Sequence, residues 1–378
     1  MATASAQSAS GALDKARRVT VKVGSSLLAR GEEERRKWLR SLAADLQSLR
    51  SDGRQVVVVS SGAVALGREK LGLRPNPRLD QKQAAAAAGQ PLLMRAWDEA
   101  FAHFSTPTAQ LLLTISDTEA RRPWLNARAT LDVLLQRGVI PIVNENDSVA
   151  TEELRYGDND RLSARVAQMV TSDVLLLLSD VDGLYDRDPA RHADAVHLDR
   201  VETITPEIEA LASPRPGSAL GSGGMRTKLE AARIAQAFGC ATIIASGRGE
   251  HPVRAIQQGA RSTVVSASQS PASAYKSWIA GTLAPAGSVT VDEGAAAALG
   301  NGKSLLPSGV RQVTGSFERG SCVRVVGEQG AELARGITRY SAAEAQAIAG
   351  KRAGDIEACL GYTRGDELIH RDDLVLMR

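Results

Sequence analysis

The sequence has few cysteines and few aromatic residues. Its three cysteines, Cys240, Cys322 and Cys359, are far apart, with no C-x-x-C spacing and no neighbouring histidine. An odd number of scattered thiols argues against a disulfide framework and against a zinc site, and it indicates a reducing compartment. Because 378 residues contain only 4 Trp, 5 Tyr and 4 Phe, the core is expected to be mainly aliphatic.

Long hydrophobic runs and a strong charge of one sign are also missing. The longest aliphatic stretch is the five residues 174–178, whereas a bilayer requires roughly 18–20 apolar residues. The 46 Lys and Arg against 43 Asp and Glu leave a net charge of +3, too small an excess to indicate a nucleic-acid surface. The opening MATASAQSAS lacks the basic and apolar regions of a secretory signal. We therefore expect a cytoplasmic protein without a membrane role, in which residues 1–16 form a disordered tail.

Aliphatic runs alternate with helical patterns over residues 17–266. Predicted strands cover residues 19–23, 55–60, 109–114, 139–143, 173–179, 242–245 and 263–266. Predicted helices cover residues 32–50, 81–104, 124–137, 159–170 and 225–238. Uncharged strands separated by helices predict a mostly parallel sheet with helices on both faces, a three-layer αβα sandwich. In such sheets, ligands bind beyond the carboxyl ends of the strands.

The amino-acid composition changes after residue 266. Residues 267–287 are rich in Ser, Ala, Pro and Gly and predict a linker with about one helical turn. Short runs divided by glycines follow over residues 288–378 and predict a small β-rich barrel. This segment carries 11 Lys and Arg against 12 Asp and Glu. It therefore lacks the basic surface of a strong RNA-binding domain.

One lysine interrupts the apolar run VTVKVGSSLL, residues 19–28. A central strand tolerates Lys22 only with an anionic partner, because an unpaired buried charge is costly. Gly24 follows, where a small residue allows a phosphate to approach backbone N–H groups. The alternative is an edge strand with Lys22 facing solvent.

Two further strands end in polar turns. In VVVVSSGAVALG, residues 56–67, the segment Ser61–Gly62–Ala63 leads into a helix whose first N–H groups form an anion site, unless the serine is only a helix cap. In IPIVNENDSVA and GDNDRLSA, residues 140–150 and 157–164, acids and amides lie at or beyond strand ends: Asn144, Glu145, Asn146, Asp147, Asp158, Asn159 and Asp160. Their density suits an α-amino group or cationic residues around phosphates, although loops use Asn and Asp for turns as well.

Two segments later in the chain complete the pattern. A buried strand ends at Ser179–Asp180, and GSGGMRTKLEAA, residues 221–232, is a glycine-rich loop that reaches Thr227 and Lys228 at a helix start. That loop is either a phosphate cradle or a flexible linker. A Walker A loop is not formed at residues 302–304, because Ala297 stands where its first glycine belongs. Lys22 and Lys228 could converge on one ligand, which is the logic of phosphoryl transfer.

Together the segments VKVGSS, SSGA, NENDxVA, GDNDxLSA, LLLLSDVDGLY and GSGGMRTK resemble the amino acid kinase family over residues 17–266. Within that family the likeness is greatest to the branch that phosphorylates the γ-carboxylate of L-glutamate, the first step of proline synthesis. Residues 288–378, with VDEGAAAAL, VTGSFERG and LGYTRGDELIHRDDLVL, resemble the PUA domain of that branch. The resemblance implies ATP as co-substrate, with Mg²⁺ on the nucleotide phosphates and no metal ligands from the protein.

The resemblance also implies roles for individual residues. Lys22 and Lys228 would stabilise the transferring phosphoryl group, and Asp160 would organise both lysines. The positions implied to bind glutamate are Ser61, Gly62, Ala63, Asp147 and Asn159. The positions implied to bind ATP, besides the two lysines, are Gly24, Ser179, Asp180, Ser222, Gly223, Gly224, Met225, Arg226 and Thr227.

Partners follow from the same resemblance. It implies a homodimer or homotetramer, feedback inhibition by proline, and a γ-glutamyl phosphate reductase that accepts the labile acyl phosphate. The alternatives are a sister enzyme acting on N-acetylglutamate or aspartate, RNA binding or modification through the PUA segment, and a non-catalytic sensor of proline or glutamate. The NEND and GDND pair argues against the sister enzymes, and the presence of both lysines argues against the sensor.

Overall fold

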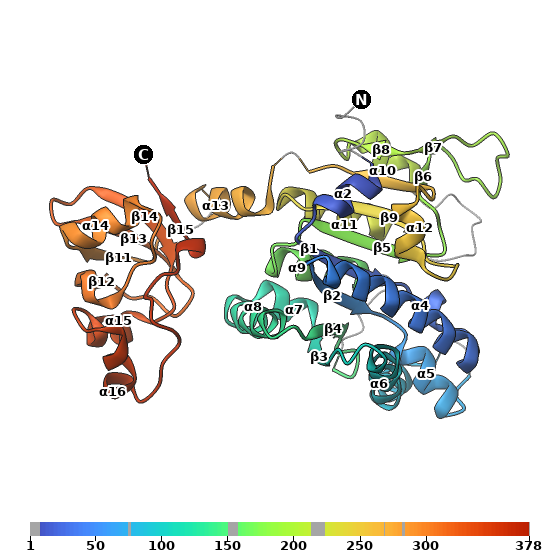
Figure 1. The fold of residues 1–378 in the computed structure, drawn as a ribbon, viewed down its shortest axis with the longest axis horizontal. Helices are drawn as coiled ribbons and strands as arrows, with labels where there is room; N and C mark the ends of the chain where they lie inside the picture. The colour runs from blue at the N-terminus through green and yellow to red at the C-terminus, as the bar shows by residue number, and fades with distance from the viewer. Residues whose placement is uncertain are drawn as a thin grey trace. The chain divides into compact units, whose positions relative to one another are not determined.

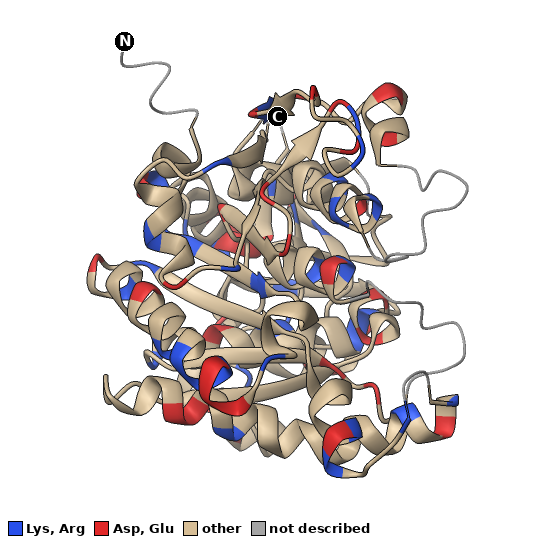
Figure 2. Cartoon of the chain, turned by 90° about the vertical axis from the view of Figure 1, so that its right-hand side faces the viewer, with Lys and Arg blue, Asp and Glu red and all other residues tan. Residues whose placement is uncertain are grey.

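The computed structural model describes residues 8–74, 77–149, 158–212, 224–267, 269–281 and 284–377. The chain divides into two compact units, residues 1–271 and 272–378. Within the described residues, no helix is long and apolar enough to cross a membrane. Over the part of the molecule that Figure 2 turns toward the viewer, acidic and basic residues are interspersed on the helices and loops, as the balanced charge predicts.

The first unit is built on an eight-stranded sheet (Figure 1). In spatial order its strands are β3 (Thr108–Leu113), β4 (Ile140–Glu145), β2 (Gln55–Ser60), β1 (Arg18–Val23), β5 (Val174–Ser179), β9 (Ala241–Ser246), β10 (Ser262–Val265) and β8 (Arg200–Val201). All neighbours are parallel except β9 and β10. A short hairpin joins β6 (Leu184–Tyr185) to β7 (His197–Leu198). The predicted mostly parallel sheet is confirmed.

Helices cover both faces of this sheet (Figure 1). The helices of the first unit are α2 (Ala9–Lys15), α3 (Ser25–Leu28), α4 (Glu32–Ser51), α5 (Ala63–Lys70), α6 (Leu79–Ala102), α7 (Ile115–Glu119), α8 (Arg121–Gln136), α9 (Asp158–Met169), α10 (Pro206–Leu211), α11 (Met225–Ala237) and α12 (Pro252–Gln257). Successive strand residues face opposite sides. Val19, Val21 and Val23 therefore pack in one aliphatic core with α2, α4, α6 and α12. Leu175 and Leu177 pack on the other side, with α9 and α11.

The amino-terminal segment differs from the expectation of disorder. Residues 9–15 form α2, which Ser8 caps by accepting a hydrogen bond from the Gly11 N–H at 3.1 Å. Leu13 is fully buried in the core of the first unit. The prediction of disorder was wrong for this helix. Its small residues suggest a tail, but burial of Leu13 in the core stabilises the helix.

The second unit contains a five-stranded sheet in the order β12 (Val310–Gly315), β11 (Gly287–Val291), β13 (Cys322–Gly327), β14 (Glu332–Ile337) and β15 (Leu374–Leu376). Its helical elements are α13 (Pro271–Gly281), α14 (Glu293–Gly300), α15 (Ala342–Ile348), α16 (Ile356–Leu360), η1 (Pro307–Gly309), η2 (Ala353–Asp355) and η3 (Arg371–Asp373). The β-rich second domain is confirmed. The predicted linker is different, because α13 is an 11-residue helix. Tyr275 of α13 donates a hydrogen bond to Asp373 of the same unit at 3.0 Å.

Candidate functional site

Lys22 lies on a central strand of the sheet. Strand β1 pairs with β2 on one side and with β5 on the other, so the edge-strand alternative is wrong. The side chain of Lys22 is only 8% exposed. Alternation along β1 directs it to the side of the sheet covered by α9 and α11, opposite Val21 and Val23. A charge buried there requires a partner.

Asp160 is that partner, and it is shared. It lies in the first turn of α9, where its side chain is 1% exposed. Its Oδ1 is 2.5 Å from Nζ of Lys22, and its Oδ2 is 3.2 Å from Nζ of Lys228, in the first turn of α11. Lys22 therefore forms a close ion pair with Oδ1, and Lys228 donates a hydrogen bond to Oδ2. The structure therefore brings together the three residues that the sequence predicts to be catalytic.

Burial and charge act in opposite directions on these groups. Burial alone would raise the pKa of Asp160, but Lys22 and Lys228 outweigh it and hold this pKa below its ordinary value. The pKa of Lys22 is lowered, chiefly by burial, with Asp160 opposing the shift and Lys228 adding to it. Two buried ammonium groups against one buried carboxylate leave a surplus positive charge. Such a site favours an anionic ligand.

The turn after β2 lies at the same edge of the sheet. Gly62 has a φ of 106°, a left-handed conformation that glycine adopts without strain. The Ser61 N–H donates to the carbonyl of Val23 at 3.2 Å, which ties this turn to the end of β1. Ala63 begins α5 directly after it. The free N–H groups of this helix start therefore lie next to the strand that carries Lys22.

The turns after β1 and β5 are in close backbone contact. The Gly24 N–H donates to the carbonyl of Leu178 at 3.0 Å, and a Cβ on Gly24 would lie 3.3 Å from that oxygen. Ser179 is buried at the end of β5, and its carbonyl accepts a hydrogen bond from the Gly247 N–H at 2.7 Å. Asp180 is exposed and contributes to the field at Lys22. The predicted residues of these two turns therefore lie beside β1.

The start of α11 separates residues that were predicted as one group. Thr227 donates a hydrogen bond to Oδ2 of Asp160 at 2.7 Å. Arg226 is exposed and pairs with Glu230 at 3.1 Å, while Met225 packs against the hydrophobic core. Gly224 precedes the helix as its cap. Ser222 and Gly223 lie outside the described residues.

Asn159 directly precedes Asp160 in the sequence and presents a buried acceptor atom. Its Oδ1 has no hydrogen-bond partner among the described residues. Buried polar atoms are nearly always satisfied. An unsatisfied carbonyl oxygen next to Asp160 is therefore suited to accept a hydrogen bond from a ligand.

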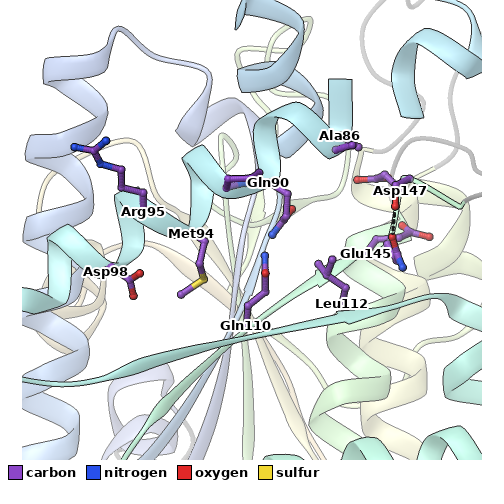
Figure 3. A pocket seen from close by; sticks show the side chains of 13 residues that line it. Ala86, Gln90, Met94, Arg95, Asp98, Gln110, Leu112, Glu145 and Asp147 are labelled. Atoms are coloured by element: carbon purple, nitrogen blue, oxygen red, sulfur yellow. Dashed lines mark hydrogen bonds between the residues drawn. The ribbon is translucent and has the colours of Figure 1, made fainter. Parts of the chain in front are cut away.

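A cavity of about 470 Å³ lies between α6, β3 and the residues that follow β4 (Figure 3). Asp147 lines it, and in Figure 3 the amides of Gln90 and Gln110 point toward each other across it. Gln90 is nine-tenths buried, and its Oε1 accepts a hydrogen bond from Asn144 at 2.8 Å. Gln90 was not predicted as a site residue, because it lies in an alanine-rich helix without a recognisable motif.

An αβα sandwich with two buried lysines on one carboxylate, at the carboxyl ends of its strands, belongs to the α/β proteins that bind anionic ligands. The model of the amino acid kinase family matches residues 17–246, and that of the PUA domain matches residues 287–360. The chain is 57% identical to the glutamate 5-kinase of Caulobacter vibrioides strain NA1000 / CB15N, covering 97% of this chain and 98% of that protein. It is 53% identical to the glutamate 5-kinase of Paramagnetospirillum magneticum, covering 96% and 99%.

Among solved structures, the carbamate kinase of Giardia lamblia bound to AMP-PNP covers 67% of this chain, with 19% identity and a TM-score of 0.45; 99% of that protein is covered. The family assignment depends on the family model and the sequence relatives. The chain belongs to the amino acid kinase family and is a kinase with a PUA domain.

Proposed function

We propose that this chain transfers the γ-phosphoryl group of ATP to the side-chain carboxylate of L-glutamate in the cytoplasm. The product is L-glutamyl 5-phosphate, and the reaction is the first step of proline synthesis from glutamate. The observation that carries the proposal is the convergence of Lys22 and Lys228 on Asp160. The choice of glutamate is supported by relatives named glutamate 5-kinase, which match nearly the whole chain.

The chemistry requires little from the protein except positioning and charge. A glutamate carboxylate is ionised at neutral pH, so it attacks without a general base. One of its oxygens forms a bond to the γ-phosphorus while the bond to the oxygen bridging the β-phosphate breaks, and ADP leaves with that electron pair. Lys22 and Lys228 balance the charge on the transferring group. Asp160 holds both lysines, and its low pKa keeps it ionised.

Two groups of residues would hold the substrates. For glutamate we propose the helix start at Ser61–Ala63 together with Asp147 and Asn159, whose free Oδ1 suits the α-amino group. For ATP we propose the two lysines with the turns at Gly24 and Ser179–Asp180 and with residues 222–227 before and within α11. Apart from Lys22, which lies on β1, each described member of these groups follows a strand of the sheet or lies at the start or in the first turn of a helix.

Magnesium is proposed to arrive with the nucleotide. Among the described residues, no group of three or more His, Cys, Asp and Glu side chains could hold a metal ion. Asp160, the buried carboxylate nearest the lysines, is engaged by both of them. These residues do not fit a magnesium site built by the protein, so no step here passes through one. When bound, Mg²⁺ would neutralise the nucleotide phosphates.

The regulation and the partners are part of the proposal. We expect proline to inhibit, a homodimer or homotetramer to form, and a γ-glutamyl phosphate reductase to accept the product, because the acyl phosphate is labile. RNA is not expected to bind strongly to residues 288–378, which carry no excess of basic residues. Pull-down of the reductase and a salt-dependent shift with RNA test the last two points on the full chain.

A hydroxamate assay tests the reaction directly, because hydroxylamine traps an acyl phosphate as it forms. The full chain is assayed with ATP and Mg²⁺ and with L-glutamate, L-aspartate or N-acetyl-L-glutamate. We expect rapid product with glutamate and at least about tenfold less with the other two, since an unmatched polar group on binding costs about 1–3 kcal/mol. A preference for aspartate or N-acetylglutamate would replace the proposed substrate.

A further inference from the structure

Thr227 lies closer to Asp160 than its neighbouring lysine does. Its Oγ1 is 2.7 Å from Oδ2 of Asp160, whereas Nζ of Lys228 is 3.2 Å from the same oxygen. The carboxylate is almost fully buried. A hydrogen bond to a buried carboxylate is among the strong ones, because the acceptor is charged and water does not compete.

The hydroxyl has one proton, and the described residues place two acceptors within its reach, Oδ2 of Asp160 and the carbonyl of Gly224. The carbonyl of Gly224 is 3.1 Å from Oγ1, farther than the carboxylate. If the proton went to Gly224, a lone pair of the hydroxyl would face the carboxylate oxygen and repel it. The proton is therefore committed to Asp160, and the Thr227 hydroxyl has no proton left to donate to a nucleotide phosphate.

We propose that Thr227 is a positioning residue, which fixes the Asp160 carboxylate so that Lys22 and Lys228 are held at the transferring phosphoryl group. This rests on the proposed function, and it assigns the Thr227 hydroxyl to Asp160, while the backbone of residue 227 stays in the proposed ATP site. Asp160 makes one ion pair through Oδ1, and Thr227 and Lys228 share Oδ2. Without the hydroxyl, only the flexible ammonium groups would orient the carboxylate.

Steady-state kinetics with three variants of the full chain test this role. Thr227→Val removes the hydroxyl at similar volume, and Thr227→Ser keeps it. Thr130→Val is the matched control, since Thr130 is exposed and its hydroxyl donates to the carbonyl of Asn126 within the same helix, α8. We expect Thr227→Val to lower kcat roughly 10- to 100-fold, with less than about threefold change in KM for ATP and glutamate. Thr227→Ser and Thr130→Val should stay within about threefold of the original enzyme.

Binding of ADP, measured by calorimetry, separates positioning from nucleotide contact. Its dissociation constant should be unchanged in Thr227→Val. A tenfold weaker ADP affinity with unchanged kcat would overturn the proposal and return Thr227 to nucleotide binding. Equal kinetics of Thr227→Val and the original enzyme would overturn it too.

Acid unfolding gives a readout that does not depend on the substrate. Asp160 faces Lys22, Lys228 and Thr227, and all three favour its ionised form. Thr227→Val should therefore lose stability at a higher pH than the original enzyme, while Thr227→Ser should not. Coincident acid profiles of Thr227→Val and the original enzyme would overturn the proposal, even if glutamate proves not to be the substrate.

Discussion

Gly67 of α5 lies against Gly89 of α6 with no room for a side chain between them. A Cβ on Gly67 would lie 2.7 Å from the Gly89 nitrogen, and a Cβ on Gly89 would lie 2.5 Å from the Gly67 nitrogen. The same Cβ on Gly89 would overlap the carbonyl of Ala63, the first residue of α5. This backbone contact therefore fixes the helix start that is proposed to bind glutamate.

Gly67→Ala is expected to destabilise the protein and to weaken glutamate binding. Forcing a methyl group between two packed helices costs about 1–3 kcal/mol or more. Urea unfolding should show this loss, and KM for glutamate should rise more than KM for ATP. Gly31→Ala is the control, because a Cβ there meets nothing within 4 Å and its φ of −53° suits alanine. Equal stability of the two variants would contradict the close packing.

Lys22→Ala and Lys228→Ala are each expected to lower kcat by about 10²–10³, the usual effect of losing one transition-state donor. Far-ultraviolet circular dichroism should show that both variants remain folded. Lys37→Ala provides a control, since Lys37 is exposed and pairs only with Glu250 on the surface. A near-normal rate for either buried lysine variant would remove that lysine from the mechanism.

Asn159→Ala is expected to raise KM for glutamate about tenfold or more, while KM for ATP changes little. The Oδ1 of Asn159 makes no hydrogen bond among the described residues, so its removal should not lower the free energy of unfolding through a lost bond. Asn301→Ala, in the second unit, is the control. If KM for glutamate is unchanged, this oxygen does not contact the substrate.

The stability provided by Asp160 should depend on pH. Its folded-state pKa lies below its unfolded value near 4, so its contribution is complete above that value and is lost as the pH falls through the folded-state pKa. At pH 7, Asp160→Asn leaves two buried lysines without their carboxylate and should cost about 3–5 kcal/mol. This difference from the original protein should narrow below about pH 4. A difference that is constant between pH 7 and pH 3 would contradict the ion pairs.

One thiol should react readily with Ellman's reagent in the native protein. Cys359 is exposed, whereas Cys240 and Cys322 are buried. Burial raises the pKa of the Cys240 thiol, which removes the reactive thiolate. Cys359→Ser should abolish the fast phase, and the two remaining thiols, Cys240 and Cys322, should react readily only after denaturation. Two fast thiols would indicate that one of the buried sites opens.

The seven longest strands and the five longest helices of the first unit could be predicted, because the strands are short aliphatic runs and the helices are longer amphipathic or alanine-rich segments. Strand β5 was placed within one residue, since VLLLLS is a buried run with no other interpretation. The partner of Lys22 could not be assigned from periodicity alone; the family resemblance supplied Asp160, and the structure adds the geometry. The hydrogen bond from Thr227 to Asp160 could not be predicted, because spacing does not show which acceptor a hydroxyl faces.

Local pattern failed where tertiary contacts decide. Helix α2 is stabilised by the burial of Leu13, and α13 by contacts within the second unit, and neither segment has a strong helical period of its own. The cavity beside α6 could not be predicted, because its walls come from elements that are distant in the sequence. The sequence pattern therefore predicts the layered architecture, whereas the residues that line the cavity are determined by tertiary packing.

The sharing of Asp160 by two lysines also determines when the site can form during synthesis of the chain. Lys22 comes from the first strand of the unit and Lys228 from its last long helix. A nascent chain on the ribosome that has not yet extruded α11 contains Asp160 and only one of its two cations. In the proposed mechanism, which needs both lysines, phosphoryl transfer therefore cannot begin until nearly the whole first unit has been synthesised and folded.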